Sequence, residues 1–215
     1  MDLLNKAETI DHFRDQVAKD PINTKAREGL YYFSATEIKP EPWIQNTVIV
    51  TMHPTAEAGM PHTRPPNIIC LPAYYPEHLK ENTLLHEYLH IDQRRRPSEW
   101  SGRFQKDGWT SFNEEIPERW LRRCRLNPDT LDQRFWSFKG YVPLPLYERE
   151  DNPKLRDVVV HWWDTKSGIK LSEPPRLFLE RYGSLEQPEH PRELAAVELA
   201  SKIKNTNDID SYLDR

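Results

Sequence analysis

Two histidines four positions apart enclose a glutamate in the run His86-Glu87-Tyr88-Leu89-His90. On a helix, side chains four residues apart lie one turn apart on the same face, so His86 and His90 can point their imidazoles at one metal ion. Glu87 lies beside that face, where its carboxylate can reach a water molecule activated by the metal without binding the metal itself. The spacing therefore predicts a hydrolytic zinc site with Glu87 as its general base.

The residues around this motif indicate a largely buried helix, because Leu84, Leu85 and Ile91 flank the polar positions. Burying two imidazoles and a carboxylate without partners is costly, and a metal with its water satisfies all three. An exposed helix with solvated histidines is the alternative, which the apolar flanks oppose. We expect the helix to begin near Asn82 or Thr83 and to end before Pro97, with the arginines at positions 94–96 solvated at its end.

A catalytic zinc needs three protein ligands and one open position, so a third ligand must come from elsewhere in the chain. The pattern that places a third histidine six residues after the second, behind a glycine, is excluded because Arg96 and Gln93 occupy those positions. A carboxylate on a second helix remains. Glu193 is the preferred candidate, since it opens a helix predicted for residues 191–203 in which the small Ala196 allows close approach. The other candidates are Glu198, Glu114, Glu115, Glu118 and His190.

Glu193 could instead serve only its own helix by compensating the amides of the first turn. That alternative is weaker, because a reciprocal capping box has Ser, Thr or Asp at the cap, and the residue before this helix is His190.

Composition limits the partners of the chain. The 215 residues include 30 Lys and Arg against 34 Asp and Glu, a formal net charge of −4, which gives no electrostatic reason to expect nucleic acid or an anionic membrane as partner. No stretch approaches ~18 consecutive apolar residues and no basic flank precedes an apolar run, so we expect a soluble, cytoplasmic protein. Cys70 and Cys124 are expected to be free thiols. The oligomeric state is not predicted.

The pattern of the remaining residues favours a single α+β domain over residues 1–215. A small mixed or antiparallel sheet is expected to pack on the histidine helix and on the C-terminal helix that carries Glu193. A proline-bounded strand at 67–71 is expected at a sheet edge, where it could hold an extended substrate by main-chain pairing. Other strands are expected at 30–33, 47–52, 140–147, 157–163 and 169–171, and other helices from a Thr9 cap to Pro21, at 98–106 and at 117–125.

Four short blocks carry a resemblance to a known family. They are Met60-Pro61-His62-Thr63, the run from His86 to Arg94, Asn127-Pro128-Asp129, and His190-Pro191-x-Glu193-x-x-Ala196. In this order they resemble an uncharacterised group of small zincin-like proteins, related more widely to the gluzincin metallopeptidases. The resemblance implies a zincin-like fold, a Zn²⁺ cofactor held by His86, His90 and Glu193, and peptide or protein substrates. The long gap between His90 and Glu193 departs from the better-known gluzincins.

The expected mechanism is hydrolysis of a peptide bond, in which Glu87 takes a proton from the attacking water and passes it to the leaving amine. The developing oxyanion needs a further donor, for which Tyr182, His161 and Tyr141 have suitable chemistry. Two alternatives stay open. One is a non-catalytic binding module on a zincin fold, and the other is a zinc hydrolase that acts on a non-peptide amide.

Overall fold

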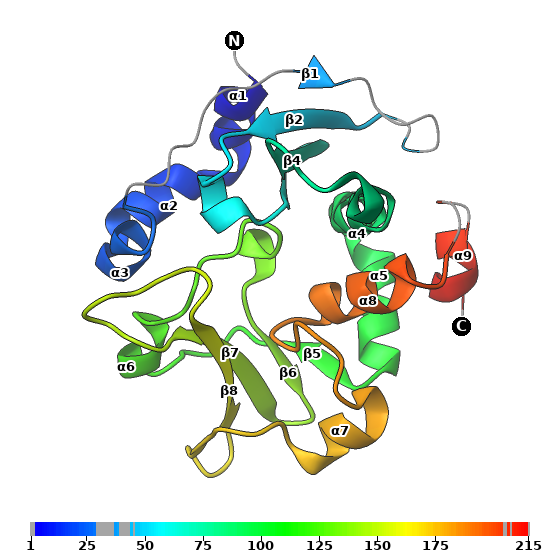
Figure 1. Ribbon diagram of the computed structural model, residues 1–215. Coiled ribbons are helices and arrows are strands. Elements are labelled where there is room, and N and C mark those ends of the chain that lie inside the picture. The colour runs from blue at the N-terminus through cyan, green and yellow to red at the C-terminus, as the bar shows by residue number, and fades with distance from the viewer. Residues whose placement is uncertain are drawn as a thin grey trace.

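The computed structural model describes residues 3–28, 37–38, 44, 46–203, 206 and 208–214, in which helices and strands are mixed along the chain (Figure 1). The predicted α+β class is confirmed. The helices are α1 (Leu3–Asp11), α2 (Phe13–Lys19), α3 (Pro21–Lys25), α4 (Glu77–Arg95), α5 (Pro97–Lys106), α6 (Glu118–Leu121), α7 (Arg176–Tyr182), α8 (Pro191–Ala200) and α9 (Asp208–Leu213), with 3-10 turns η1 (Ala56–Gly59) and η2 (Leu131–Gln133). The strands are β1 (Glu37–Ile38), β2 (Val48–Met52), β3 (His62–Arg64), β4 (Ile68–Pro72), β5 (Trp109–Ser111), β6 (Trp136–Phe138), β7 (Tyr141–Tyr147), β8 (Val158–Asp164) and β9 (Lys170–Leu171).

The first sheet has the order β1-β2-β4-β3, with β2 and β4 parallel and the other pairs antiparallel. The strand at 47–52 is confirmed as β2. The edge position predicted for 67–71 is wrong, because β4 lies between β2 and β3 and is buried from Ile68 to Leu71. Its flanking prolines do not interrupt the sheet: Pro65 and Pro66 precede the strand, and Pro72 is its last residue, at the end of the ladder with β2.

The second sheet has the antiparallel order β5-β6-β7-β8-β9. The strands predicted at 140–147, 157–163 and 169–171 are confirmed as β7, β8 and β9. The helix predicted for 117–125 is too long, since α6 ends at Leu121. Beyond it the chain joins the sheet: Cys124 forms a β-bridge with Leu146, and the Arg125 N–H donates to the Pro145 carbonyl at 2.8 Å.

Two helix boundaries also differ from prediction. The N-terminal helix is divided at His12, whose left-handed backbone (φ 51°) separates α1 from α2, so Thr9 lies inside α1 and caps nothing. The histidine helix α4 begins at Glu77 behind Pro76, earlier than the predicted start near Asn82. The helix predicted for 98–106 is confirmed as α5. The predicted strand at 30–33 lies outside the described residues.

Helix α4 packs against residues of both sheets. Leu84 and Ile91 lie in an apolar cluster with Ile69 of the first sheet. Leu89 joins a second cluster that contains Ala196 of α8 and the aromatic residues of the second sheet. In Figure 1, α4 and α8 accordingly lie beside each other between the two sheets. Burial of opposite sides of α4 fixes its rotation, and with it the direction of the histidines.

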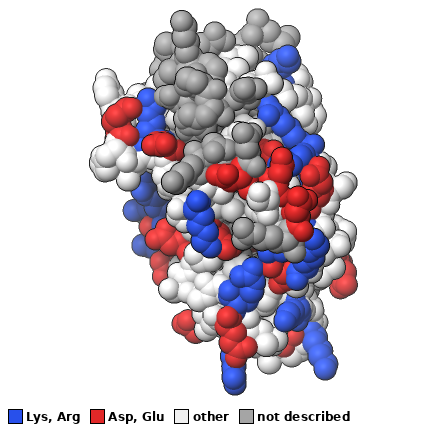
Figure 2. Space-filling view, turned by 90° about the vertical axis from the view of Figure 1, so that its right-hand side faces the viewer, with Lys and Arg blue, Asp and Glu red and all other residues white. Residues whose placement is uncertain are grey.

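On the face shown in Figure 2, acidic and basic side chains lie side by side over much of the described surface. Among the described helices, none is long and apolar enough to cross a membrane. Cys70 and Cys124 are buried free thiols, as predicted.

Candidate metal centre and its pocket

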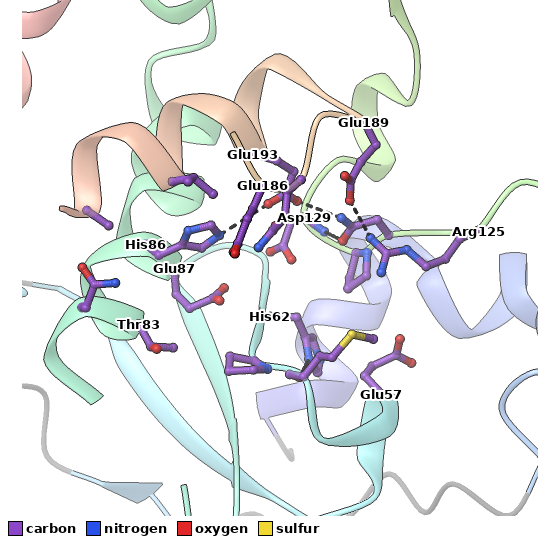
Figure 3. Close-up of a pocket in the computed structure, with 18 of the residues that line it drawn as sticks. Glu57, His62, Thr83, His86, Glu87, Arg125, Asp129, Glu186, Glu189 and Glu193 are labelled. Atoms are coloured by element: carbon purple, nitrogen blue, oxygen red, sulfur yellow. Dashed lines mark hydrogen bonds and ion pairs between the residues drawn. The ribbon is translucent and has the colours of Figure 1, made fainter. Parts of the chain in front are cut away.

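Three side-chain atoms from α4 and α8 meet in a compact triangle (Figure 3). The two histidine Nε2 atoms of His86 and His90 lie 3.2 Å apart. The Oε2 atom of Glu193 lies 3.4 Å from Nε2 of His86 and 3.2 Å from Nε2 of His90. The structure thus brings together the three residues that the sequence predicts as metal ligands.

The size of this triangle fits a zinc ion. Zinc–nitrogen and zinc–oxygen bonds of about 2.1 Å in a tetrahedral arrangement place neighbouring ligand atoms about 3.4 Å apart. The three edges measured here are 3.2–3.4 Å. Two imidazoles and one carboxylate are also the donor set that catalytic zinc sites use. The residues present therefore match the metal in both spacing and chemistry.

A neighbouring glutamine orients His90. Its Nδ1 lies 2.9 Å from Oε1 of Gln93, while the Gln93 amide nitrogen donates to the Arg192 carbonyl at 3.0 Å. Because a carbonyl oxygen only accepts, this second bond determines which way the Gln93 amide faces. The proton of neutral His90 is consequently on Nδ1, and the lone pair of Nε2 points into the triangle. Such a partner is typical of histidines that bind metals.

Glu193 is held in the same way through its other oxygen. The Asn127 amide donates to Oε1 of Glu193 at 2.8 Å, and Oδ1 of Asn127 accepts the Asp129 N–H at 3.0 Å. Burial tends to raise the pKa of Glu193, but His90 and His86 hold that pKa well below its usual range. Burial likewise opposes protonation of His90, yet Glu193 and Asp129 raise its pKa to about 9. The two shifts have one cause, the attraction between the imidazoles and the Glu193 carboxylate.

Glu87 lies next to this triangle with an unsatisfied oxygen. The residue is 4% exposed and lines the pocket, and its Oε2 has no hydrogen-bond partner in the described part of the chain. Burial, followed by the nearby charge of Asp129, raises the pKa of Glu87 well above its usual range. Buried polar atoms are normally hydrogen-bonded, so this oxygen indicates a ligand or water in the pocket. In Figure 3 the Glu87 carboxylate points into that space.

The pocket has a volume of about 450 Å³. Residues from all four blocks of the family resemblance line it, among them His62, His86, Asn127 and Glu193. These blocks lie far apart in the sequence and belong to β3, to α4, to the loop before η2 and to α8. Their convergence makes this pocket the candidate functional site.

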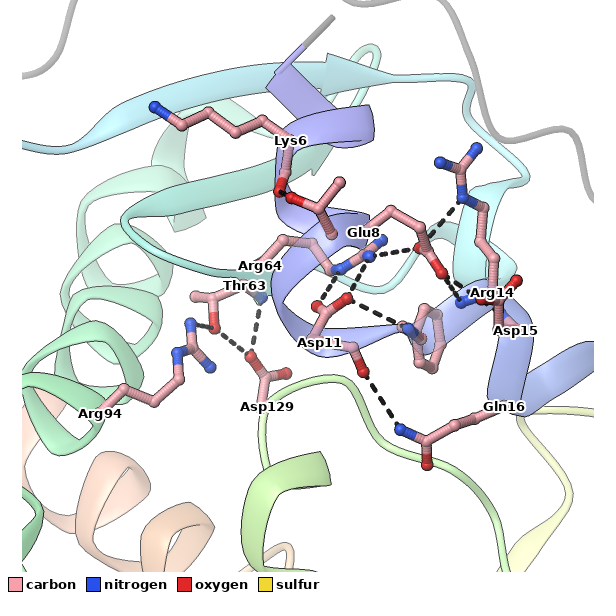
Figure 4. Close-up of polar contacts among 12 residues, drawn as sticks. Lys6, Glu8, Asp11, Arg14, Asp15, Gln16, Thr63, Arg64, Arg94 and Asp129 are labelled. Atoms are coloured by element: carbon pink, nitrogen blue, oxygen red, sulfur yellow. Dashed lines mark hydrogen bonds and ion pairs between the residues drawn. The ribbon is translucent and has the colours of Figure 1, made fainter.

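A buried polar network lies behind the pocket (Figure 4). Oδ1 of Asp129 accepts the Thr63 N–H at 2.7 Å and the Thr63 hydroxyl at 2.5 Å. The Arg94 guanidinium donates to the same hydroxyl, and its Nε and Nη1 are buried without a hydrogen-bond partner among the described residues. The prediction that the arginines at 94–96 are simply solvated is therefore wrong for Arg94, which turns inward to compensate Asp129.

The outer edge of β3 cannot receive an extended peptide through N–H donors. Because β3 pairs with β4 through residues 62 and 64, the main-chain N–H and C=O groups of residues 61, 63 and 65 point away from β4. Pro61 and Pro65 have no N–H, and the Thr63 N–H is bonded to Asp129. Since β4 itself is internal, the predicted main-chain pairing of a substrate with residues 67–71 is wrong, and the true edge strand offers no free donor in its place.

The residues predicted to stabilise an oxyanion are not brought to this pocket. The Tyr182 hydroxyl accepts a hydrogen bond from the Trp109 indole at 2.8 Å within an aromatic cluster, and burial raises its pKa to about 12. His161 on β8 lies 3.0 Å from the Lys170 ammonium. Tyr141 packs against the same aromatic cluster as Tyr182. None of the three lines the pocket, because α7 and the second sheet hold them elsewhere.

The alternative third ligands are also placed elsewhere. Nδ1 of His190 accepts the Arg192 N–H at 3.1 Å and its Nε2 donates to the Gln133 carbonyl at 2.8 Å, so both ring nitrogens are used. Burial lowers its pKa to about 3, which keeps the ring neutral. His190 thus caps α8 by using a ring nitrogen as acceptor. Glu198 pairs with Lys202 at 2.8 Å, and Glu114, Glu115 and Glu118 are exposed.

Sequence reasoning assigned no role to several residues of the site. Gln93 and Asn127 orient the predicted ligands, and Tyr75 places a phenol in the pocket wall, where its hydroxyl lies 2.8 Å from that of Thr83. His62 is buried in the wall, with Nδ1 donating to the Met60 carbonyl at 3.2 Å. A signal existed for three of them, since Gln93, Asn127 and His62 lie in the blocks that carry the family resemblance.

Comparison of the chain with models of known protein families, with curated proteins and with solved structures finds no match.

Proposed function

We propose that this chain is a zinc-dependent metallopeptidase of the gluzincin type, with a zincin-like fold. His86, His90 and Glu193 would hold the metal, and Glu87 would act as general base. The observation that carries the proposal is the triangle of ligand atoms with zinc-sized edges, beside a buried carboxylate oxygen that has no partner among the described residues.

The chemistry divides between the metal and the protein. When bound, a zinc ion polarises the amide carbonyl and makes water acidic enough to attack near neutral pH. Glu87 takes the proton of the attacking water and delivers it to the leaving amine. Gln93 and Asn127 hold the ligands in position, and the Tyr75 hydroxyl is the phenolic donor that the pocket offers to the developing negative charge.

The first test combines metal content with turnover. Protein purified without chelators should contain one zinc per chain and should cleave a random-sequence peptide mixture, detected by mass spectrometry. Glu87→Gln should retain zinc but lose about 10²-fold or more of the turnover, because the base is removed and the ligands are kept. His90→Ala should lose the zinc as well. A Glu87→Gln protein with full activity would refute this mechanism.

The same measurements distinguish the alternatives. Zinc without peptide cleavage, but with hydrolysis of small acyl amides, identifies a hydrolase of non-peptide amides. Absence of stoichiometric metal from chelator-free protein identifies a non-catalytic binding module.

A further inference from the structure

If the pocket is a peptidase site, as proposed above, it must hold its substrate without a free N–H donor from β3. The outward positions of that strand offer only Pro61, Pro65 and a Thr63 N–H that already bonds to Asp129. Affinity and selectivity then depend on the side chains that line the pocket. The charges of these side chains limit which end of a substrate they can receive.

Two glutamates from the loop before α8 line the pocket together with Glu193 (Figure 3). The Glu189 side chain is nine-tenths buried, and its Oε1 accepts a hydrogen bond from Nη2 of Arg125 at 2.9 Å. A carboxylate has about four lone-pair sites, so this bond leaves Glu189 with capacity to accept others. Glu186 is exposed and has no ion-pair partner among the described residues. Both carboxylates can therefore accept hydrogen bonds from a ligand.

The pocket offers no comparable receptor for a negative group. Among its described lining residues, Arg125 is the only arginine or lysine. Its charge is already compensated by Glu189. A substrate carboxylate would have to compete with Glu189 for this arginine. Recognition of a substrate through a free C-terminal carboxylate is therefore disfavoured.

The charge balance of the whole pocket favours a cation. Glu57 is compensated by the buried Arg27 at 2.8 Å. Asp129 is compensated by Arg94, which donates to the Thr63 hydroxyl that bonds to Asp129. A divalent metal and Arg125 then face the remaining carboxylates of the pocket, which belong to Glu87, Glu186, Glu189 and Glu193 and leave one negative charge when all four are ionised. A cleft lined by side chains of one charge attracts ligands of the opposite charge.

We propose that the pocket selects substrates that carry a positively charged group close to the bond that is cleaved, and that Glu186 and Glu189 bind this group. The α-ammonium group of a peptide N-terminus and the side chain of lysine or arginine share this chemistry. Oε2 of the buried Glu87, which has no partner among the described residues, indicates independently that the same pocket takes a ligand.

Three peptide amides test the proposal by calorimetry on the zinc-loaded Glu87→Gln protein, in which binding is measured without turnover. They are Leu-Ala-Ala amide with a free α-ammonium group, its N-acetyl form, and N-acetyl Lys-Ala-Ala amide. At least one charged peptide should bind about tenfold more tightly than the neutral N-acetyl Leu peptide, and the two charged peptides separate an N-terminal from a side-chain preference. Raising sodium chloride from about 50 to about 500 mM should reduce the difference.

A second substitution assigns the effect to the pocket. Glu186→Gln should remove most of the preference for positively charged peptides. The control Glu118→Gln removes one negative charge from exposed α6 and should leave that preference unchanged. Equal affinities for the three peptides, no binding of any peptide up to about 10 mM, or an unchanged preference in Glu186→Gln overturns the proposal. If the wild type cleaves no peptide but the preference is present and depends on Glu186, the pocket binds cations and the peptidase function fails alone.

Discussion

At the scale of single residues, the site depends on partners that hold the ligands as much as on the ligands themselves. Gln93 stands one turn beyond His90 on α4, so its amide reaches the ring nitrogen that faces away from the triangle. Asn127, in the loop before η2, donates its amide to the Glu193 oxygen that is not part of the triangle. Each partner leaves one lone pair directed at the common centre, which lowers the cost of organising the ligands when a metal binds.

Replacement of Gln93 by alanine tests this role. The variant loses the acceptor for the His90 Nδ1 proton, so the ring can turn or change tautomer, and zinc affinity should fall about 10–100-fold. The dissociation constant can be measured by competition with a coloured chelator. Gln105→Ala, on the exposed surface of α5, is the matched control and should bind zinc as the wild type does. Unchanged affinity in Gln93→Ala would show that the glutamine has no orienting role.

At the scale of elements, the site is made by the contact between α4 and α8. Leu89 of α4 packs in one apolar cluster with Ala195 and Ala196 of α8, and Ala196 is completely buried. The small side chains let the helix axes approach closely enough for the Glu193 carboxylate to reach both histidines. The polar contact from Gln93 to the Arg192 carbonyl joins the same two helices.

Ala196→Leu should disturb this contact. Inserting a larger side chain into a filled interface should lower the free energy of unfolding by about 1–3 kcal/mol, because α8 must move away from α4. The same displacement separates Glu193 from the histidines, so zinc affinity should fall as well. Urea unfolding and chelator competition measure the two effects. Ala18→Leu on the exposed side of α2 is the control, and if both variants behave alike the close approach of the helices is unimportant.

At the scale of the whole molecule, the ligands connect segments that are far apart in the chain. His86 and His90 belong to α4 between the sheets, whereas Glu193 belongs to α8, which packs on the aromatic residues of the second sheet. A metal bound by all three therefore acts as a crosslink that exists only in the folded state, and a ligand of the folded state stabilises it by mass action.

Removal of the metal should therefore lower the stability of the fold. With free zinc a thousandfold above its dissociation constant, the loss on chelation should be about 4 kcal/mol in the free energy of unfolding. Thermal or urea unfolding with and without a chelator measures it. His90→Ala, which lacks a ligand, should show no difference between the two conditions. A wild type equally stable with and without chelator would argue against a zinc site formed by both helices.

Part of this architecture could be predicted from local pattern. The four-residue spacing of His86 and His90 places them on one helical face by geometry alone, and the residues of 140–147 and 157–163 were enough to predict two strands. Glu193 was preferred because carboxylates complete such sites and because Ala196 permits close packing. The helix and strand predictions succeed because helical and strand periodicity depend on neighbouring residues.

The rest was determined by contacts between distant segments. Asp129 reaches Thr63, Asn127 reaches Glu193, and Arg94 turns inward only because the loop before η2 lies against β3 and α8. Periodicity in the sequence does not predict which loop lies against which strand. The proline-bounded run at 68–72 has the pattern of an edge strand, but in the fold β3 pairs with its outer side. Sequence alone therefore specified the face of α4 that carries both histidines, whereas tertiary packing decided the approach of Glu193, the blocked N–H donors of β3 and the acidic lining of the pocket, because those depend on which surfaces the folded chain brings together.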